Sequence, residues 1–184
     1  MILHLFRRTP RAATIASLYG MIVAQARSPA FYEGYAVPDT VDGRFEMVTL
    51  HTVLLLSRLE IGPADLRRLG QGLFDAFCRD MDASMREMGV GDLAVPRKMR
   101  RIGEAFYGRQ AAYREALAAA TDAPLMASLN RNVYAGAAPE RAAERLARYI
   151  RETAAALAAQ DGAALLRAEL RFPDPDRIAR AALA

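Results

Sequence analysis

Two aspartates come closest to the spacing of a catalytic metal site. Asp80 and Asp82 flank Met81, and carboxylate oxygens are the ligands that Mg²⁺ takes in helical enzymes that act on diphosphates. On a helix, however, residues two apart point about 200° away from each other. Asp82 would instead share a face with Asp75 and Arg86, and no second aspartate-rich segment is present. We therefore predict no metal site, no cofactor and no small-molecule substrate, and an enzyme acting on an isoprenoid diphosphate is the weakest alternative.

Residues that could act as nucleophiles or soft metal ligands are sparse. His51 lies midway along the most apolar segment, where we expect a hydrogen-bonded core histidine rather than a haem or metal ligand. His4 is expected to be solvated. One cysteine, Cys78, excludes an internal disulfide, and with two histidines it cannot form a structural zinc site. The chain carries no motif of a phosphate-binding loop, a dinucleotide site or a serine nucleophile.

The densest basic cluster opens a predicted helix and consists of Arg97, Lys98, Arg100 and Arg101. Basic side chains at a helix start oppose the helix dipole, so we expect Asp92, Glu87 or a partner to compensate. The net charge of +4 permits contact with an anionic surface without requiring it. A solvated helix end and an RNA- or ribosome-binding site both stay open, although no nucleic-acid motif and no interleaved aromatic accompanies the cluster.

Methionines repeat along the segment that carries the aspartates. Met81, Met85 and Met88 continue a stripe from Leu66 at steps of three and four, which predicts one face of a helix. Core filling is the default interpretation. The alternative is an adaptable surface for varied apolar helices, because thioether side chains change shape easily.

The elements that position these residues are predicted to be helices. The composition, 53% hydrophobic and 25% charged, is typical of a folded protein, and no segment alternates as a strand would. We predict an all-α, single-domain helical bundle of about six or more helices over residues 1–184. The expected helices span about 11–27, 40–59, 63–88, 96–120, one opened by Pro124, and one from Pro139 to Ala159, with an aromatic segment at 29–35 and a frayed helical piece after Phe172. The helix at 40–59 is apolar around most of its circumference and is predicted to be central and buried.

The longest uncharged stretch, residues 12–26, is too short and too polar to cross a bilayer. It imitates a secretory signal, because Arg7, Arg8 and Arg11 precede it and an Ala-Gln-Ala sequence ends it. Its helical spacing favours an ordinary amphipathic helix instead. We expect a cytoplasmic protein whose basic N-terminus contacts lipid, or one that is peripheral on the cytoplasmic face of the inner membrane.

Three stretches of the sequence resemble the ubiquinol–cytochrome c chaperone family. They are Leu18-Tyr19-Gly20 to Phe31-Tyr32, Val37-Pro38-Asp39-Thr40-Val41-Asp42-Gly43-Arg44-Phe45-Glu46 to Arg58-Leu59, and Leu73-Phe74-Asp75 through Arg86-Glu87-Met88-Gly89-Val90-Gly91-Asp92 to Ala105-Phe106-Tyr107-Gly108-Arg109. The family-like core covers about residues 15–120, and the Ala/Arg-rich C-terminal helices at 121–184 neither support nor oppose the resemblance.

The resemblance implies an all-α assembly chaperone without catalytic activity. It implies binding to newly made cytochrome b and a role in biogenesis of the ubiquinol–cytochrome c reductase (bc1) complex, with the ribosome and a small helical partner protein as further candidates. Because the uncharged N-terminal stretch matches the family's folded part, the resemblance also argues against export.

Cytochrome b is a bundle of apolar helices, which need a temporary apolar cover before insertion. We predict a groove that provides this cover and assign its residues by type. The aromatic lining is Phe31, Tyr32, Tyr35, Phe106 and Tyr107, and the charged rim is Asp39, Arg44, Asp82, Arg86, Asp92 and Arg109. The alternative, left open, is that the aromatics are core and the charges are internal salt bridges.

Overall fold

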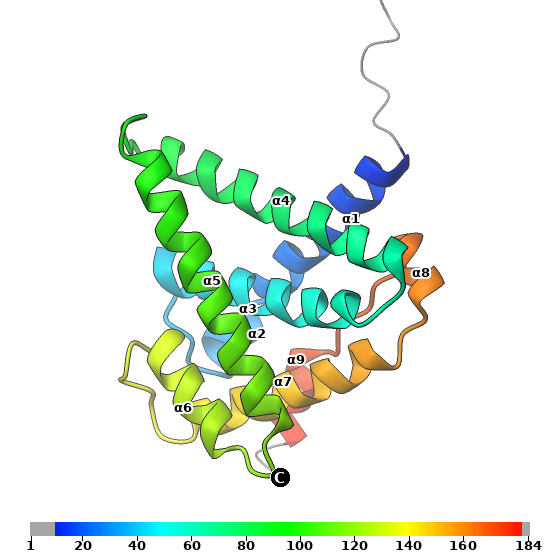
Figure 1. Cartoon of the computed structure of the whole chain (residues 1–184). Coiled ribbons are helices and arrows are strands. Elements are labelled where there is room, and N and C mark those ends of the chain that lie inside the picture. The colour runs from blue at the N-terminus through cyan, green and yellow to red at the C-terminus, as the bar shows by residue number, and fades with distance from the viewer. Residues whose placement is uncertain (1–9, 182–184) are drawn as a thin grey trace, which may run out of the picture.

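The computed structural model describes residues 10–181, and within this range the chain forms helices and loops without strands (Figure 1). The helices are α1 (Pro10–Ala26), α2 (Pro29–Glu33), α3 (Val41–Glu60), α4 (Ala64–Glu87), α5 (Val95–Ala118), α6 (Ala123–Asn132), α7 (Ala142–Ala158), α8 (Gly162–Leu166) and α9 (Pro175–Ala181). The predicted all-α class is confirmed, and the first four predicted long helices agree with α1, α3, α4 and α5 to within two residues at each end.

Helix α3 is the centre of the structure, as its apolar circumference predicts. It packs against α1, α4, α5 and α7, and most of its side chains from Glu46 to Leu56 are buried. In Figure 1 it lies behind α5, with α4 above it and α7 below. A helix surrounded on all sides needs apolar side chains on all sides, which explains the absence of a polar face between Met47 and Leu56.

The start of α3 is fixed by a capping residue and a glycine. The hydroxyl of Thr40 accepts a hydrogen bond from the backbone N–H of Gly43 at 3.1 Å, which satisfies one of the free donors of the first turn. A Cβ atom at position 43 would lie 2.0 Å from the carbonyl oxygen of Pro38. Only glycine allows the preceding loop to fold back this closely.

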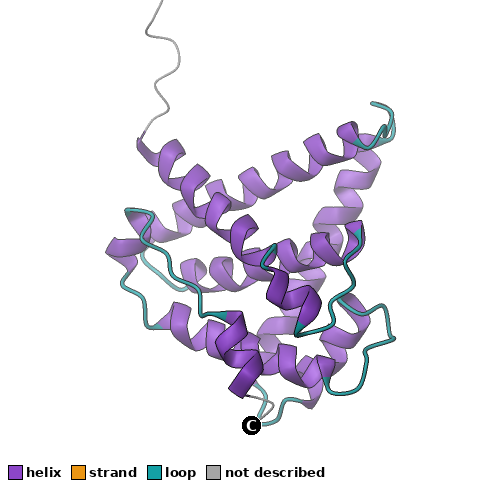
Figure 2. Cartoon of the chain, turned by 180° about the vertical axis from the view of Figure 1, so that it is seen from behind, coloured by secondary structure: helices purple, strands orange, loops and turns teal. Residues whose placement is uncertain are grey.

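Helices α4 and α5 form an antiparallel pair that spreads from a shared turn at one outer corner of the molecule (Figures 1 and 2). The apolar stripe of α4 is buried from Leu66 through Met85, as its spacing predicts. The stripe ends at Met88, which is 58% exposed. The same row of methionines therefore begins in the core and leaves it at the end of the helix.

The C-terminal part differs more from the prediction. Pro139 does not open a helix: α7 begins at Ala142, because Arg141 adopts a left-handed backbone with φ 59°. Helix α8 was not predicted. The alanine-rich α7 buries Leu146, Tyr149 and Ile150 completely, so it contributes to the core despite its few bulky residues.

Two arginines join the ends of distant helices. Arg58 of α3 donates to the carbonyl oxygens of Leu157 and Gln160 at the end of α7. Arg151 of α7 donates to the carbonyl oxygen of Leu117 at the end of α5 and pairs with Asp122. A cation at a helix C-terminus satisfies free carbonyl groups and opposes the negative end of the dipole, so each arginine ties two elements together.

None of the helices within residues 10–181 combines the length and apolarity needed to cross a bilayer. The predicted lipid contact of the basic N-terminus involves Arg7 and Arg8, and these two residues and His4 lie outside the described part of the chain.

Candidate functional site

An open apolar groove lies between the first half of α3, the second half of α4 and α5. Its cavity has a volume of about 520 Å³. The lining side chains are Arg27, Val41, Asp42, Arg44, Phe45, Val48, Asp80, Met81, Ser84, Met85, Glu87, Met88 and Ile102; we call this the methionine groove. Because α3 and α4 are antiparallel neighbours, the start of one and the end of the other form the two walls.

The floor of the methionine groove is apolar and its mouth is unusually exposed. Val48, Met81 and Met85 are buried and join the groove to the core. Val41 is 64% exposed and Met88 is 58% exposed at the mouth. Unbranched thioether side chains fill irregular gaps and adapt to different surfaces, so this site suits an apolar helix whose surface varies.

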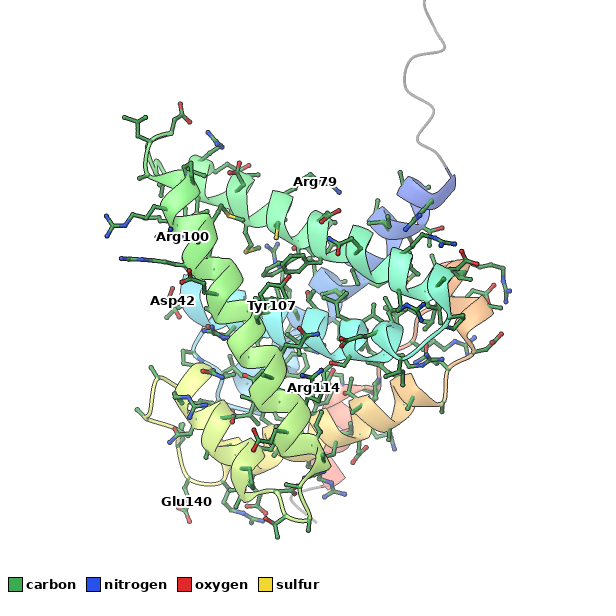
Figure 3. The ribbon with its side chains drawn as sticks, viewed as in Figure 1. Asp42, Arg79, Arg100, Tyr107, Arg114 and Glu140 are labelled. Carbon is green, nitrogen blue, oxygen red and sulfur yellow. The ribbon has the colours of Figure 1, made fainter. Side chains whose placement is uncertain are left out.

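Charged and polar groups surround the opening. The Tyr19 hydroxyl donates to the Asp80 carboxylate at 2.7 Å, and burial together with this bond raises the pKa of Tyr19 above its ordinary value. Arg44 pairs with Asp39 at 2.6 Å, and the Arg44 hydrogen bond lowers the pKa of Asp39. Figure 3 shows Asp42 on the α5 side of the molecule, below Arg100. The rim thus carries both signs of charge.

A second, polar cavity of about 380 Å³ adjoins the methionine groove and shares two of its lining arginines. Its lining is Arg27, Pro29, Tyr32, Glu33, Asp39 and Arg44. The Tyr32 hydroxyl donates to the carbonyl oxygen of Ala26 at 3.0 Å, so the tyrosine is anchored to the end of α1. The structure brings three predicted site residues together here: Tyr32, Asp39 and Arg44.

Three predicted lining aromatics are buried in the core and none of them lines the methionine groove; for Phe31 and Tyr35 the assignment to an open groove is wrong. Phe31 and Tyr35 are fully buried, and Phe106 is 1% exposed. Phe31 packs edge-on against Tyr149 with ring centroids 4.9 Å apart, and the Tyr35 hydroxyl donates to the carbonyl oxygen of Pro175 at 2.7 Å. C-terminal segments, whose packing the local sequence does not reveal, cover both rings.

Arg109 is likewise not a rim residue. Its guanidinium donates to both carboxylate oxygens of Glu46, one of them at 2.8 Å, and the pair is largely buried between α3 and α5. Burial raises the pKa of Glu46, and the bonds from Arg109 oppose that rise. The alternative of an internal salt bridge therefore holds for this residue.

The remaining predicted site residues lie apart from the methionine groove. Asp82 and Arg86 pair at 2.7 Å on α4, and Arg86 also binds Asp92, so these exposed residues form one cluster beside the α4–α5 turn. Tyr107 is 59% exposed and lines, with Phe74 and Phe106, a smaller cavity of about 200 Å³ between α3, α4 and α5. The single predicted groove is thus divided, with aromatic core side chains between its parts.

The basic cluster lies on the first turns of α5, where Arg97, Lys98, Arg100 and Arg101 are all exposed. Arg100 pairs with Glu104 at 3.7 Å, and Figure 3 shows it on the outer side of α5. The expected compensation by Asp92 is absent, because Asp92 binds Arg86.

His51 is a hydrogen-bonded core residue, as predicted. It is fully buried, and its Nδ1 lies 2.8 Å from the carbonyl oxygen of Met47. A carbonyl only accepts, so Nδ1 carries the proton and Nε2 accepts from the Tyr149 hydroxyl at 2.9 Å. Burial lowers the pKa of His51 to about 4. Gln25 completes the chain by donating to the Tyr149 oxygen at 3.0 Å.

Within residues 10–181, no three His, Cys, Asp or Glu side chains lie close enough together to hold a metal ion. The methionine groove combines an apolar floor, an exposed apolar mouth and a mixed-charge rim. Sequence reasoning missed Val41, Phe45, Val48 and Ile102 of the lining. The available signal was the methionine stripe that runs on past the buried part of α4 to the exposed Met88.

Comparisons with known proteins agree with the resemblance seen in the sequence. The pattern of the ubiquinol-cytochrome C chaperone family matches residues 33–172. The crystal structure of the Cbp3 homolog from Brucella abortus is similar with a TM-score of 0.85 and 37% sequence identity, covering 96% of this chain and 99% of that chain. No curated protein matches. The match over most of the chain shows that this protein belongs to the ubiquinol–cytochrome c chaperone family.

Proposed function

We propose that this protein is a non-catalytic assembly chaperone that holds an apolar helix of newly made cytochrome b in the methionine groove during biogenesis of the bc1 complex. The observation that carries the proposal is the exposed apolar mouth of the groove, formed by Val41 and Met88 above the buried methionines. Membership of the ubiquinol–cytochrome c chaperone family supports the choice of the bc1 complex as the assembly that it serves.

The groove offers an apolar surface that can cover the exposed side chains of an uninserted membrane helix. Such a helix satisfies its own backbone hydrogen bonds but exposes apolar side chains, and covering them gains about 25 cal/mol for each Å² removed from water. Recognition of a helix in a groove needs an apolar strip with polar edges. Met81, Met85 and Met88 provide the strip, and Asp42 and Arg44 stand at its edge.

The same proposal covers partners and location. The client would be cytochrome b as it is made or inserted, with the ribosome and a small helical protein as further partners. The site of action would be the cytoplasm or the cytoplasmic face of the inner membrane, where such a client emerges.

Charge introduced at the mouth tests the proposal. We expect Val41→Glu and Met88→Glu to fold, because both side chains are largely exposed, and to reduce recovery of cytochrome b with the tagged protein from its native bacterium by about tenfold. Ile61→Glu is the matched control, because Ile61 is 80% exposed in the turn between α3 and α4, away from the groove. Equal recovery by all three variants, each folded by circular dichroism, would place the client elsewhere.

A further inference from the structure

The α4–α5 turn presents an exposed leucine directly beside the basic cluster. Leu93 is 99% exposed, and it precedes the first turns of α5, which carry Arg97, Lys98, Arg100 and Arg101. The turn forms an outer corner of the molecule in both views (Figures 1 and 2). Neither the groove nor the core uses these side chains.

Backbone hydrogen bonds hold this turn in place. Gly89 has φ 80°, and the N–H of Val90 donates to the carbonyl oxygen of Met85 at 3.0 Å, a pattern that ends helices in a left-handed residue. The N–H of Ala94 then donates to the carbonyl oxygen of Gly91 at 2.8 Å. The exposure of Leu93 is therefore built into an ordered turn.

The positive charge beside the turn has little compensation within the protein. The first turn of α5 contains no acidic residue. Among the four basic side chains, the described part of the chain gives an ion pair to Arg100 alone, with Glu104. Positive charge at a helix N-terminus is unfavourable, so an external anionic surface would relieve a cost that the fold itself leaves in place.

We propose that the α4–α5 turn docks on an anionic lipid surface, with Leu93 inserted among the headgroups and the basic cluster against their phosphates. Apolar insertion combined with several cations is what peripheral membrane attachment requires. A single-stranded RNA would instead favour exposed aromatic side chains for base stacking, and residues 88–105 contain no aromatic residue.

Docking in this way places the methionine groove at the lipid surface. Met88 belongs to the groove lining and immediately precedes Gly89 of the turn. An apolar helix leaving the groove would therefore be released next to the bilayer. The lipid contact itself stands independently of what the groove holds.

Vesicle binding of the purified full chain tests the proposal. The variant Arg97→Gln, Lys98→Gln, Arg100→Gln, Arg101→Gln is compared with a control, Arg114→Gln, Arg141→Gln, Arg167→Gln, Arg177→Gln, which has the same net charge. On vesicles of phosphatidylglycerol and phosphatidylcholine, each lost cation at the surface should weaken binding about fivefold. We expect a loss of about a hundredfold or more for the first variant and a much smaller loss for the control. Equal losses would overturn the proposal.

The variant Leu93→Gln tests whether the α4–α5 turn binds a lipid surface or a nucleic acid. We expect it to weaken vesicle binding by about tenfold, whereas Ile61→Gln, at a similarly exposed residue, should have no effect. Retention of full vesicle binding by Leu93→Gln would contradict the proposal. Absence of vesicle binding by the unchanged protein, together with salt-sensitive binding of ribosomal RNA that the basic cluster supports, would also overturn it and assign the cluster to RNA.

Discussion

The methionine groove and the aromatic core around His51 are both apolar, but they are built on opposite principles. In the core, Phe31, Tyr35 and Tyr149 pack ring against ring, and the polar atoms of His51 and Tyr149 have named partners. In the groove, flexible methionines line an open space of about 520 Å³. Fixed geometry specifies one arrangement, whereas flexible thioethers accept several.

The aromatic core around His51 stabilises the fold, whereas the methionine groove provides the surface that we propose for binding. The core joins α2, α3 and α7 through side chains with no exposure, and the partly buried Phe172 before α9 packs against His51. The groove uses the first turns of the same helix, from Val41 to Val48, where several side chains are exposed or half-buried. Helix α3 is held by the core, whereas the methionines of α4 that face it in the groove have flexible side chains.

The largest effect is expected in the core. Phe31→Ala removes a ring that is fully buried and should lower the free energy of unfolding by about 3–5 kcal/mol. Met88→Ala, at the exposed mouth, should change it by less than about 0.5 kcal/mol. Urea unfolding followed by circular dichroism measures both. Similar decreases in the free energy of unfolding for the two variants would contradict the proposal that the core, and not the groove mouth, stabilises the fold.

The core should also respond to acid. Burial lowers the pKa of His51 from 6.5 to about 4. Between pH 6.5 and pH 4 the unfolded chain therefore binds a proton that the folded protein does not, and the free energy of unfolding decreases as the pH is lowered. At pH 4 the loss reaches about 3 kcal/mol. The free energy of unfolding at several pH values measures it.

His51→Gln is the control for that acid response. This variant should be less stable than the unchanged protein at pH 7, and the gap between the two should narrow by about 3 kcal/mol toward pH 4. A gap that stays constant would mean that His51 does not titrate as a buried neutral group.

A smaller effect on stability is expected in the α4–α5 turn, next to the groove. Gly89→Ala places a Cβ atom on a residue with φ 80°, which should cost about 1 kcal/mol. Gly91→Ala is the control, because its Cβ would meet no atom within 4 Å and its φ is not in the left-handed region. A Cβ atom at position 89 would also meet no atom within 4 Å, so a lower thermal midpoint for Gly89→Ala than for Gly91→Ala reports backbone strain. Equal midpoints would argue against the ordered turn.

The smallest effect belongs to the exposed ion pairs. Arg86 pairs with Asp82 and Asp92, yet Arg86→Ala should leave the free energy of unfolding nearly unchanged, because exposed pairs are screened by water and salt. Any larger loss in urea unfolding would show that this cluster supports the turn. Recovery of cytochrome b with Arg86→Glu then tests the predicted rim role separately.

The helices were predictable because their signals are local. The stripe that starts at Leu66 and the apolar segment at 40–59 predicted α4 and α3 to within one residue at each end. The fate of the aromatics was not predictable, because Phe31 and Tyr35 are covered by Tyr149 and by Pro175, more than 100 residues away. Burial by distant segments leaves no trace in the local pattern.

The same reasoning explains the partial success at the candidate site. Arg44 and Met88 were recognisable from charge and from the methionine stripe. The pairing of Arg109 with Glu46 across 63 residues was not, because a charged residue looks the same in sequence whether it faces water or an internal partner. The identity of the other wall, Val41 to Val48, required the packing of α3 against α4.

Site-specific photo-crosslinking tests the central claim most directly. A photoreactive amino acid replaces Met88 at the mouth of the methionine groove, or Ile61 in the turn between α3 and α4, in cells that are actively making cytochrome b. We predict a cytochrome b crosslink from position 88 and none from position 61. A crosslink from position 61 but not from position 88 would contradict the assignment of the groove as the client site.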